Sequence, residues 1–188
     1  MKKYGLLFMV LTGCTGGIRA QDATGSKWLF SSFNTAGLIK GSESTEFQFQ
    51  TVNGFRKDHL FLGLGAGIDQ YRIAGIPVFA DTRFFFGKDS SSFFLYADGG
   101  MHYPVKKPPV DRLYTIRYLR GFYSDVGIGY VFGYGKRTGF VLQAGYSYKR
   151  ATERRSYRVR TPGAPDYESV DEFIYNFNRL VFRLGFRF

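Results

Sequence analysis

The amino-acid sequence predicts an all-β fold, an eight-stranded antiparallel up-and-down transmembrane β-barrel with short periplasmic turns and longer extracellular loops. Three observations indicate this fold class. The final stretch, Arg179–Phe188, alternates between large apolar side chains and cationic or small ones, which is the two-residue period of a β-strand with two unlike faces. The composition is rich in aromatic residues and glycine, with 21 Phe, 14 Tyr and 24 Gly. The connections between the candidate strands alternate in length, as they do in membrane barrels.

The final stretch indicates which face of the sheet meets which environment. Its apolar positions are Leu180, Phe182, Leu184, Phe186 and Phe188, and its other positions include Arg179, Arg183 and Arg187. The chain ends on an aromatic residue with no polar tail behind it, which favours an apolar face against lipid and arginines inside a polar barrel. A helical membrane protein would need runs of about 20 apolar residues, and the body of this chain has none.

The N-terminus is predicted to be a targeting segment: residues 1–20 are a cleaved signal peptide, residues 21–26 a short linker and residues 27–188 the barrel. Lys2 and Lys3 precede an apolar run that is too short to span a bilayer. Two kinds of processing are possible: cleavage after Ala20, and lipidation at Cys14, which ends a lipobox-like stretch. Cys14 is the only cysteine, so with either kind of processing the mature protein has no disulfide and no cysteine metal site. No cofactor is expected.

Eight segments alternate in the way that strands require. In chain order the predicted strands are Lys27–Ile39, Thr45–Val52, His59–Gln70, Ile76–Phe86, Phe93–Tyr103, Leu119–Phe132, Phe140–Tyr148 and Phe173–Phe188. The first is the least regular. The second alternates Phe47 and Phe49 with glutamines, and the third alternates leucines with glycines that leave room for lumen aromatics. In the fourth strand Pro77 is placed at the start, where a missing N–H is tolerated. The remaining strands alternate in the same way.

The predicted connections are of two kinds. Asn53-Gly54 is a tight-turn signal, with Arg56, Lys57 and Asp58 completing the turn, and residues 87–91 and 133–138 are short polar turns. Residues 104–117 and 149–172 are predicted to be long loops. Short turns therefore follow the second, fourth and sixth strands, and the longest loops follow the fifth and seventh. An even strand number places both termini on the periplasmic side.

Four stretches carry a resemblance to a known family: TVNGFR at 51–56, FLGLGAGIDQY at 61–71, IPVFADTRFFF at 76–86 and RLVFRLGFRF at 179–188. The chain resembles the small outer-membrane β-barrels of the OmpA/OmpX-like superfamily. The resemblance implies a location in the outer membrane of a Gram-negative bacterium. It also implies a C-terminal assembly signal at Leu184, Phe186 and Phe188, read by the barrel-assembly machinery. It specifies a fold and a location, and no activity.

A charged network is predicted in the lumen, because one set of ionisable residues falls on the inward strand faces. Its members are Asp69, Asp81, Arg83, Asp98, Asp125, Arg179, Arg183 and Arg187. An eight-stranded barrel is only wide enough for side chains to fill it, and unpaired buried charge is costly. We therefore expect the three C-terminal arginines to neutralise the aspartates and plug the barrel. A narrow ion path is the alternative.

A basic outer surface is predicted in the two long loops. Its residues are Lys106, Lys107, Arg112, Arg117, Lys149, Arg150, Arg154, Arg155, Arg158 and Arg160. Arginine forks match phosphate geometry, and the outer leaflet of a Gram-negative cell is rich in phosphorylated lipopolysaccharide. The surface is interpreted as a lipopolysaccharide or anion contact, with a specific partner protein as the alternative. Acidic residues from Asp166 to Glu172 follow in the same loop and can pair with these cations.

The predicted function is non-enzymatic: a structural or interaction role at the cell surface, by lipopolysaccharide contact or as a small subunit of a larger membrane complex. Nucleic acid is excluded as a partner because the chain is exported. Narrow porin-like or small-solute transport is the main alternative. A lipid A-modifying enzyme is a third, since His102 and Asp98 share one strand face, but no serine is placed as nucleophile. His59 lies at the opposite end of the barrel.

Overall fold

The computed structural model describes residues 27–87, 90–106, 108, 115–134, 137–159 and 167–188. The predicted signal peptide, the linker and Cys14 lie outside these residues. No helix in the described part of the chain is long and apolar enough to cross a membrane.

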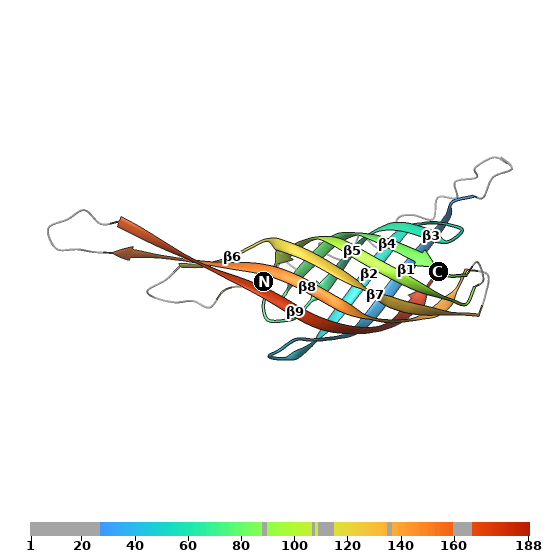
Figure 1. Ribbon diagram of the computed structural model, residues 1–188. Coiled ribbons are helices and arrows are strands. Elements are labelled where there is room, and N and C mark those ends of the chain that lie inside the picture. The colour runs from blue at the N-terminus through green and yellow to red at the C-terminus, as the bar shows by residue number, and fades with distance from the viewer. Residues whose placement is uncertain (1–26, 88–89, 107, 109–114, 135–136, 160–166) are drawn as a thin grey trace, which may run out of the picture.

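The described residues form one antiparallel sheet of nine strands, eight of which close into a ring (Figure 1). The ring contains all of the strands except the short β6, and it closes where Phe33–Lys40 of the first strand pair with Leu180–Arg187 of the last. The eight-stranded barrel predicted from the sequence is therefore confirmed. The strands are β1 (Leu29–Lys40), β2 (Thr45–Lys57), β3 (Leu60–Asp69), β4 (Gly75–Phe85), β5 (Ser92–Pro104), β6 (Thr115–Leu119), β7 (Gly121–Gly133), β8 (Gly139–Val159) and β9 (Tyr167–Arg187).

The strands alternate between a buried lumen face and an exposed outer face. In β4 every second residue is buried, so Asp81 and Arg83 lie inside while Val78 and Phe84 are about half exposed on the outside. The outer face carries an apolar middle band that includes Leu64, Val126, Ile128, Phe182 and Leu184. Aromatic residues flank this band at the short-turn end, among them Phe30, Phe55, Phe86, Phe93, Phe132 and Phe186. An apolar band with an aromatic girdle is the exterior of a barrel that is solvated by lipid.

Aromatic side chains fill the lumen at the short-turn end. Phe33 packs edge-to-face on Phe61, with ring centroids 5.1 Å apart, and Phe85 lies 5.2 Å from Phe94. The guanidinium of Arg83 lies 3.9 Å above the Phe33 ring, where a cation is attracted by the ring face. All five side chains are buried, so this end of the barrel is a packed core and not an opening.

The predicted start of the first short turn, at Asn53-Gly54, is wrong. β2 continues to Lys57, and the turn falls at Asp58, which has a positive φ of 51°. Gly54 lies within the β2–β3 pairing directly opposite Gly63. A Cβ atom at Gly54 would collide with the carbonyl oxygen of Leu62. This glycine therefore allows a close approach of two strands, and the turn chemistry of the dipeptide is not used.

The predicted loop at residues 149–172 is also wrong, because β8 and β9 are each 21 residues long and continue beyond the ring. Residues 149–159 of β8, residues 167–178 of β9 and the short β6 form a three-stranded projection, called the extension below (Figure 1). The pairing register places Arg154 opposite Glu172 and Arg155 opposite Asp171. Cross-strand pairs of opposite charge stabilise a sheet, so a charged segment that suggested a solvated loop forms a hairpin instead. The predicted loop 104–117 likewise includes the start of β6.

Candidate functional site

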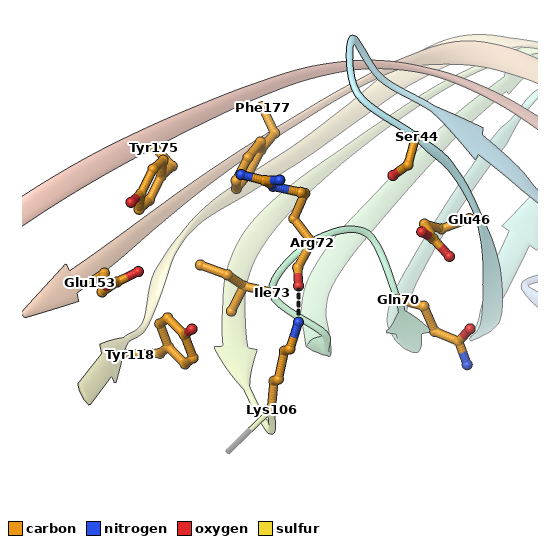
Figure 2. A pocket seen from close by; sticks show the side chains of 10 residues that line it. All are labelled: Ser44, Glu46, Gln70, Arg72, Ile73, Lys106, Tyr118, Glu153, Tyr175 and Phe177. Atoms are coloured by element: carbon orange, nitrogen blue, oxygen red, sulfur yellow. Dashed lines mark hydrogen bonds between the residues drawn. The ribbon is translucent and has the colours of Figure 1, made fainter. Parts of the chain in front are cut away.

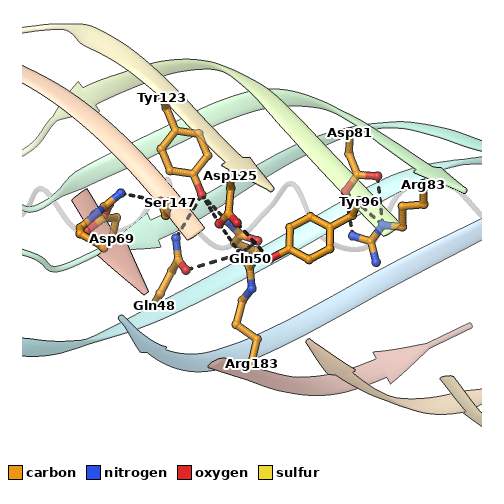
Figure 3. Close-up of polar contacts among 11 residues, drawn as sticks. Gln48, Gln50, Asp69, Asp81, Arg83, Tyr96, Tyr123, Asp125, Ser147 and Arg183 are labelled. Atoms are coloured by element: carbon orange, nitrogen blue, oxygen red, sulfur yellow. Dashed lines mark hydrogen bonds and ion pairs between the residues drawn. The ribbon is translucent and has the colours of Figure 1, made fainter. Parts of the chain in front are cut away.

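The charged residues of the lumen form three contact groups along the barrel axis (Figure 3). The central group is built around Arg183, whose Nη1 atom lies 3.0 Å from Oδ2 of Asp125. Arg183 also donates to the Tyr96 hydroxyl at 2.8 Å and to the Gln50 side-chain oxygen. The hydroxyls of Tyr96 and Tyr123 donate to the two oxygens of Asp125 at 3.0 and 3.1 Å. Four strands thus meet at one arginine–carboxylate pair across the lumen.

The second group lies at the opposite end from the short turns and is centred on Asp69. Arg179 contacts one carboxylate oxygen at 2.6 Å and Lys149 contacts the other at 3.2 Å, and all three side chains are fully buried. Lys149 also donates to the carbonyl oxygens of Tyr71 and Ile73 at 2.7 and 3.1 Å. The lysine therefore holds the β3–β4 turn, residues 70–74, across the end of the barrel from which the extension projects, called the mouth below. The buried ring of Tyr71, in this turn, covers that end of the lumen.

The third group pairs Arg83 with Asp81, whose closest atoms are 2.8 Å apart. Asp98 lies between Asp81 and Asp125 in the strand register, and one of its oxygens has no hydrogen-bond partner among the described residues. All eight charged residues that were predicted to face the lumen are buried.

One expected pairing is wrong. Arg187 makes no ion pair with any of the four described lumen aspartates. It lies at the short-turn end and donates to the carbonyl oxygens of Arg137 and Ser90 at 3.1 and 3.4 Å. The aspartates lie further along the barrel, so this arginine ties together turns at the barrel's end.

The predicted basic surface is only partly present. Lys149 is fully buried on Asp69, so the prediction that it contacts lipopolysaccharide from a loop is wrong. Arg154 pairs with Glu172 at 2.5 Å and Arg155 with Glu153 at 2.6 Å. Lys106 donates to the carbonyl oxygen of Arg72 at 3.0 Å. The side chains of Lys107, Arg112, Arg158 and Arg160 lie outside the described part of the structure.

Three arginines do share the outward face of the extension. Arg117 and Arg154 are directly opposite each other on β6 and β8. Arg150 lies on the same face of β8, four residues closer to the barrel, and all three are exposed. Like charges that face each other across a strand pair repel, and Glu172 contacts only one member of this set. Below them, the hydroxyls of Tyr146 and Tyr148 donate to Asn178 and Asn176 at 2.6 and 2.8 Å.

A cavity of about 430 Å³ lies at the mouth, above the Tyr71 cap and at the base of the extension (Figure 2). Its walls come from the β1–β2 and β3–β4 turns, the end of β5, and β6, β8 and β9. Sequence reasoning missed it, because its walls include segments that were predicted to be loops. The alternation of Tyr175 and Phe177 with the exposed Asn176 and Asn178 was the available signal.

The residues considered for catalysis are not assembled into a site. His102 is fully buried in β5, and neither of its ring nitrogens has a hydrogen-bond partner in the described part of the chain. Asp98 therefore does not orient it. The His59 ring nitrogen Nδ1 lies 2.7 Å from the carbonyl oxygen of Phe85 at the short-turn end. Within the described ranges, no three His, Cys, Asp or Glu side chains are grouped so as to hold a metal ion.

Comparison with known proteins identifies the fold. The structure is similar to the N-terminal β-barrel domain of Pseudomonas aeruginosa OprF, with a TM-score of 0.52 and 12% identity over 86% of this chain and 100% of that one. It is also similar to the outer membrane protein OprG from Pseudomonas aeruginosa, with a TM-score of 0.53 and 11% identity over 84% of this chain and 93% of that one. No family model and no curated protein matches the sequence. The chain has the fold of the small outer-membrane β-barrels.

Proposed function

We propose that this protein is a non-enzymatic outer-membrane barrel that binds the anionic groups of lipopolysaccharide through the outward face of its extension. The observation that carries the proposal is the set of Arg117, Arg150 and Arg154, which lies on the same outward side as the apolar band of the barrel. Guanidinium groups form paired, charge-assisted hydrogen bonds with phosphate. An anion between Arg117 and Arg154 would also offset the repulsion between the two cations.

The tyrosines below these arginines support the proposal. Tyr146 and Tyr148 face outward on β8, just beneath Arg150, and their hydroxyls hydrogen-bond to asparagines of β9. Aromatic side chains with one apolar and one polar end favour the membrane–water boundary. The arginines would then lie at the height of the lipid head groups. In this orientation the extension is extracellular, and the short turns, the start of β1 and the end of β9 lie on the periplasmic side.

The closed lumen supports a binding role over transport. Buried ion pairs occupy the middle and the mouth, and closely packed aromatic rings fill the short-turn end. These contacts stabilise the ring and leave the outer surface as the functional part of the molecule. The C-terminal strand, with Leu184, Phe186 and Phe188, would serve insertion by the barrel-assembly machinery. A place beside a larger membrane complex is compatible with the same surface.

The test is retention of lipopolysaccharide by the full chain in nanodiscs of phosphatidylcholine and lipopolysaccharide. The double variant Arg117→Gln/Arg150→Gln should retain much less lipopolysaccharide than the wild type. Lys57→Gln, at the short-turn end, is the matched control and should retain as much as the wild type. The wild type should also retain much less of a lipopolysaccharide from which the phosphates have been removed. Equal retention by the double variant would refute the proposed contact.

A further inference from the structure

The mouth cavity has one aromatic wall and one polar wall (Figure 2). Tyr175 and Phe177 form the aromatic wall on β9, with their rings stacked at a centroid distance of 6.0 Å and an interplanar angle of 6°. Tyr118 of β6 stands beside them, and Ser44, Glu46 and Gln70 form the polar wall across the cavity. The volume of about 430 Å³ falls in the range of about 300–1,000 Å³ that is usual for small-molecule sites.

The charges around the cavity are balanced within the protein. Arg72 pairs with Glu43, and Glu153 pairs with Arg155. The Lys106 ammonium donates to the carbonyl oxygen of Arg72. The charged side chains of the lining are two of each sign, Arg72 and Lys106 against Glu46 and Glu153. The lining thus has no net positive charge to attract a phosphate or another anion. It therefore favours a ligand without net charge.

Several polar groups of the lining are not engaged by the protein. The carboxylate of Glu46, the carboxamide of Gln70 and the hydroxyl of Tyr175 make no hydrogen bond to another described residue. Together they offer both donors and acceptors. Burial, followed by the nearby Glu153 carboxylate, raises the pKa of the Tyr118 hydroxyl, which keeps this group a proton donor at neutral pH.

We propose that the mouth cavity binds a short neutral saccharide. A pyranose ring presents a C–H face that packs on the flat face of an aromatic ring such as that of Tyr175. Its hydroxyls donate and accept hydrogen bonds, which matches the mixed donors and acceptors of the opposite wall. An apolar solute would leave Glu46 and Gln70 desolvated without partners, and an anion would be repelled by the Glu46 carboxylate.

Two sources could supply this chemistry: the polysaccharide part of lipopolysaccharide in the same membrane, and free oligosaccharide in the medium. The inference rests on the proposed function only in that the mouth must face the outside of the cell. The binding itself requires only the folded barrel, so the two claims can fail separately.

The experiment is calorimetric titration of the refolded full chain, in a detergent without a sugar head group, with maltose, lactose and chitobiose. At least one of them should bind, and Tyr175→Ala and Glu46→Ala should each weaken its affinity by about tenfold or more. Ile174→Ala is the matched control, because Ile174 is the neighbour of Tyr175 on the opposite, exposed face of β9. It should leave the affinity within about twofold of the wild type.

The outcomes separate the claims. Failure of all three sugars to bind, or equal losses in Ile174→Ala and Tyr175→Ala, would overturn the saccharide site. If binding is found, lipopolysaccharide with its full polysaccharide should compete with the sugar and lipopolysaccharide truncated to its inner core should not; absence of this competition assigns the site to free oligosaccharide. Labelling of an Ile174→Cys variant on intact cells tests exposure. A protected cysteine would contradict the proposed orientation and leave the calorimetric result standing.

Discussion

The two halves of β8 and β9 are held together by different forces. Inside the ring, between Gly139 and Ser147 of β8, the strands carry apolar residues outward and buried, paired charges inward. In the extension the same strands are held by exposed cross-strand ion pairs such as Arg154 with Glu172. A charge pair buried in a narrow lumen is costly to break, whereas a pair in water contributes little. The same hairpin should therefore be rigid at one end and easily perturbed at the other.

The largest effect should come from the centre of the lumen. Arg183→Ala removes the partner of Asp125 and leaves a buried carboxylate, so the free energy of unfolding should fall by about 3–5 kcal/mol. The measurement is urea unfolding of the protein refolded into lipid vesicles, followed by the gel shift between folded and boiled samples. A loss below about 1 kcal/mol would show that water replaces the arginine and that the lumen is not tightly packed.

The next effect should come from the junction between the ring and the extension. Lys149→Met removes the ammonium that holds the β3–β4 turn, but Asp69 keeps Arg179 as a partner. Loss of a hydrogen-bonded charge of this kind should cost roughly 2–3 kcal/mol. Hydrogen exchange at Tyr71 and Ile73 should accelerate at the same time. An unchanged rate of hydrogen exchange at these two residues would contradict the role of Lys149 in holding the β3–β4 turn.

A backbone contact within the ring should have an intermediate effect. Gly54→Ala places a methyl group against the carbonyl oxygen of Leu62, and such overpacking should cost about 1–3 kcal/mol. Gly99→Ala is the matched control, because a Cβ at Gly99 would meet no atom within 4 Å. It should unfold at the same urea concentration as the wild type. Equal behaviour of the two variants would contradict the close strand approach at Gly54.

The smallest effect should come from the extension. Arg154→Ala breaks an ion pair whose two side chains are nearly half exposed, so the free energy of unfolding should change by about 0.2–1 kcal/mol. The difference from the wild type should shrink further in high salt, because exposed pairs are screened. A loss as large as that of Arg183→Ala would show that the extension folds cooperatively with the ring.

The same contrast explains what the sequence could predict. Ring strands such as β4 were found because apolar and polar residues alternate over their whole length, and the inward charges followed from the same parity. The extension was missed because Arg150 to Arg158 show no alternation of apolar and polar residues. Their pairing with residues 168–176 depends on a register that a single segment does not show. Lys149 was misplaced for the same reason. The mouth cavity could not be predicted, because its walls come from turns and strands that are far apart in the sequence and no local pattern shows that they meet.

Single-channel recording of the refolded protein in planar bilayers tests most directly whether the lumen is closed. The buried groups around Asp125, Asp69 and the Phe33 cluster predict no stable open currents, and none should appear in the Arg154→Ala variant. Arg183→Ala, which empties the centre of the lumen, is the variant in which brief openings are expected. Large, stable open currents through the wild-type barrel would contradict the closed lumen.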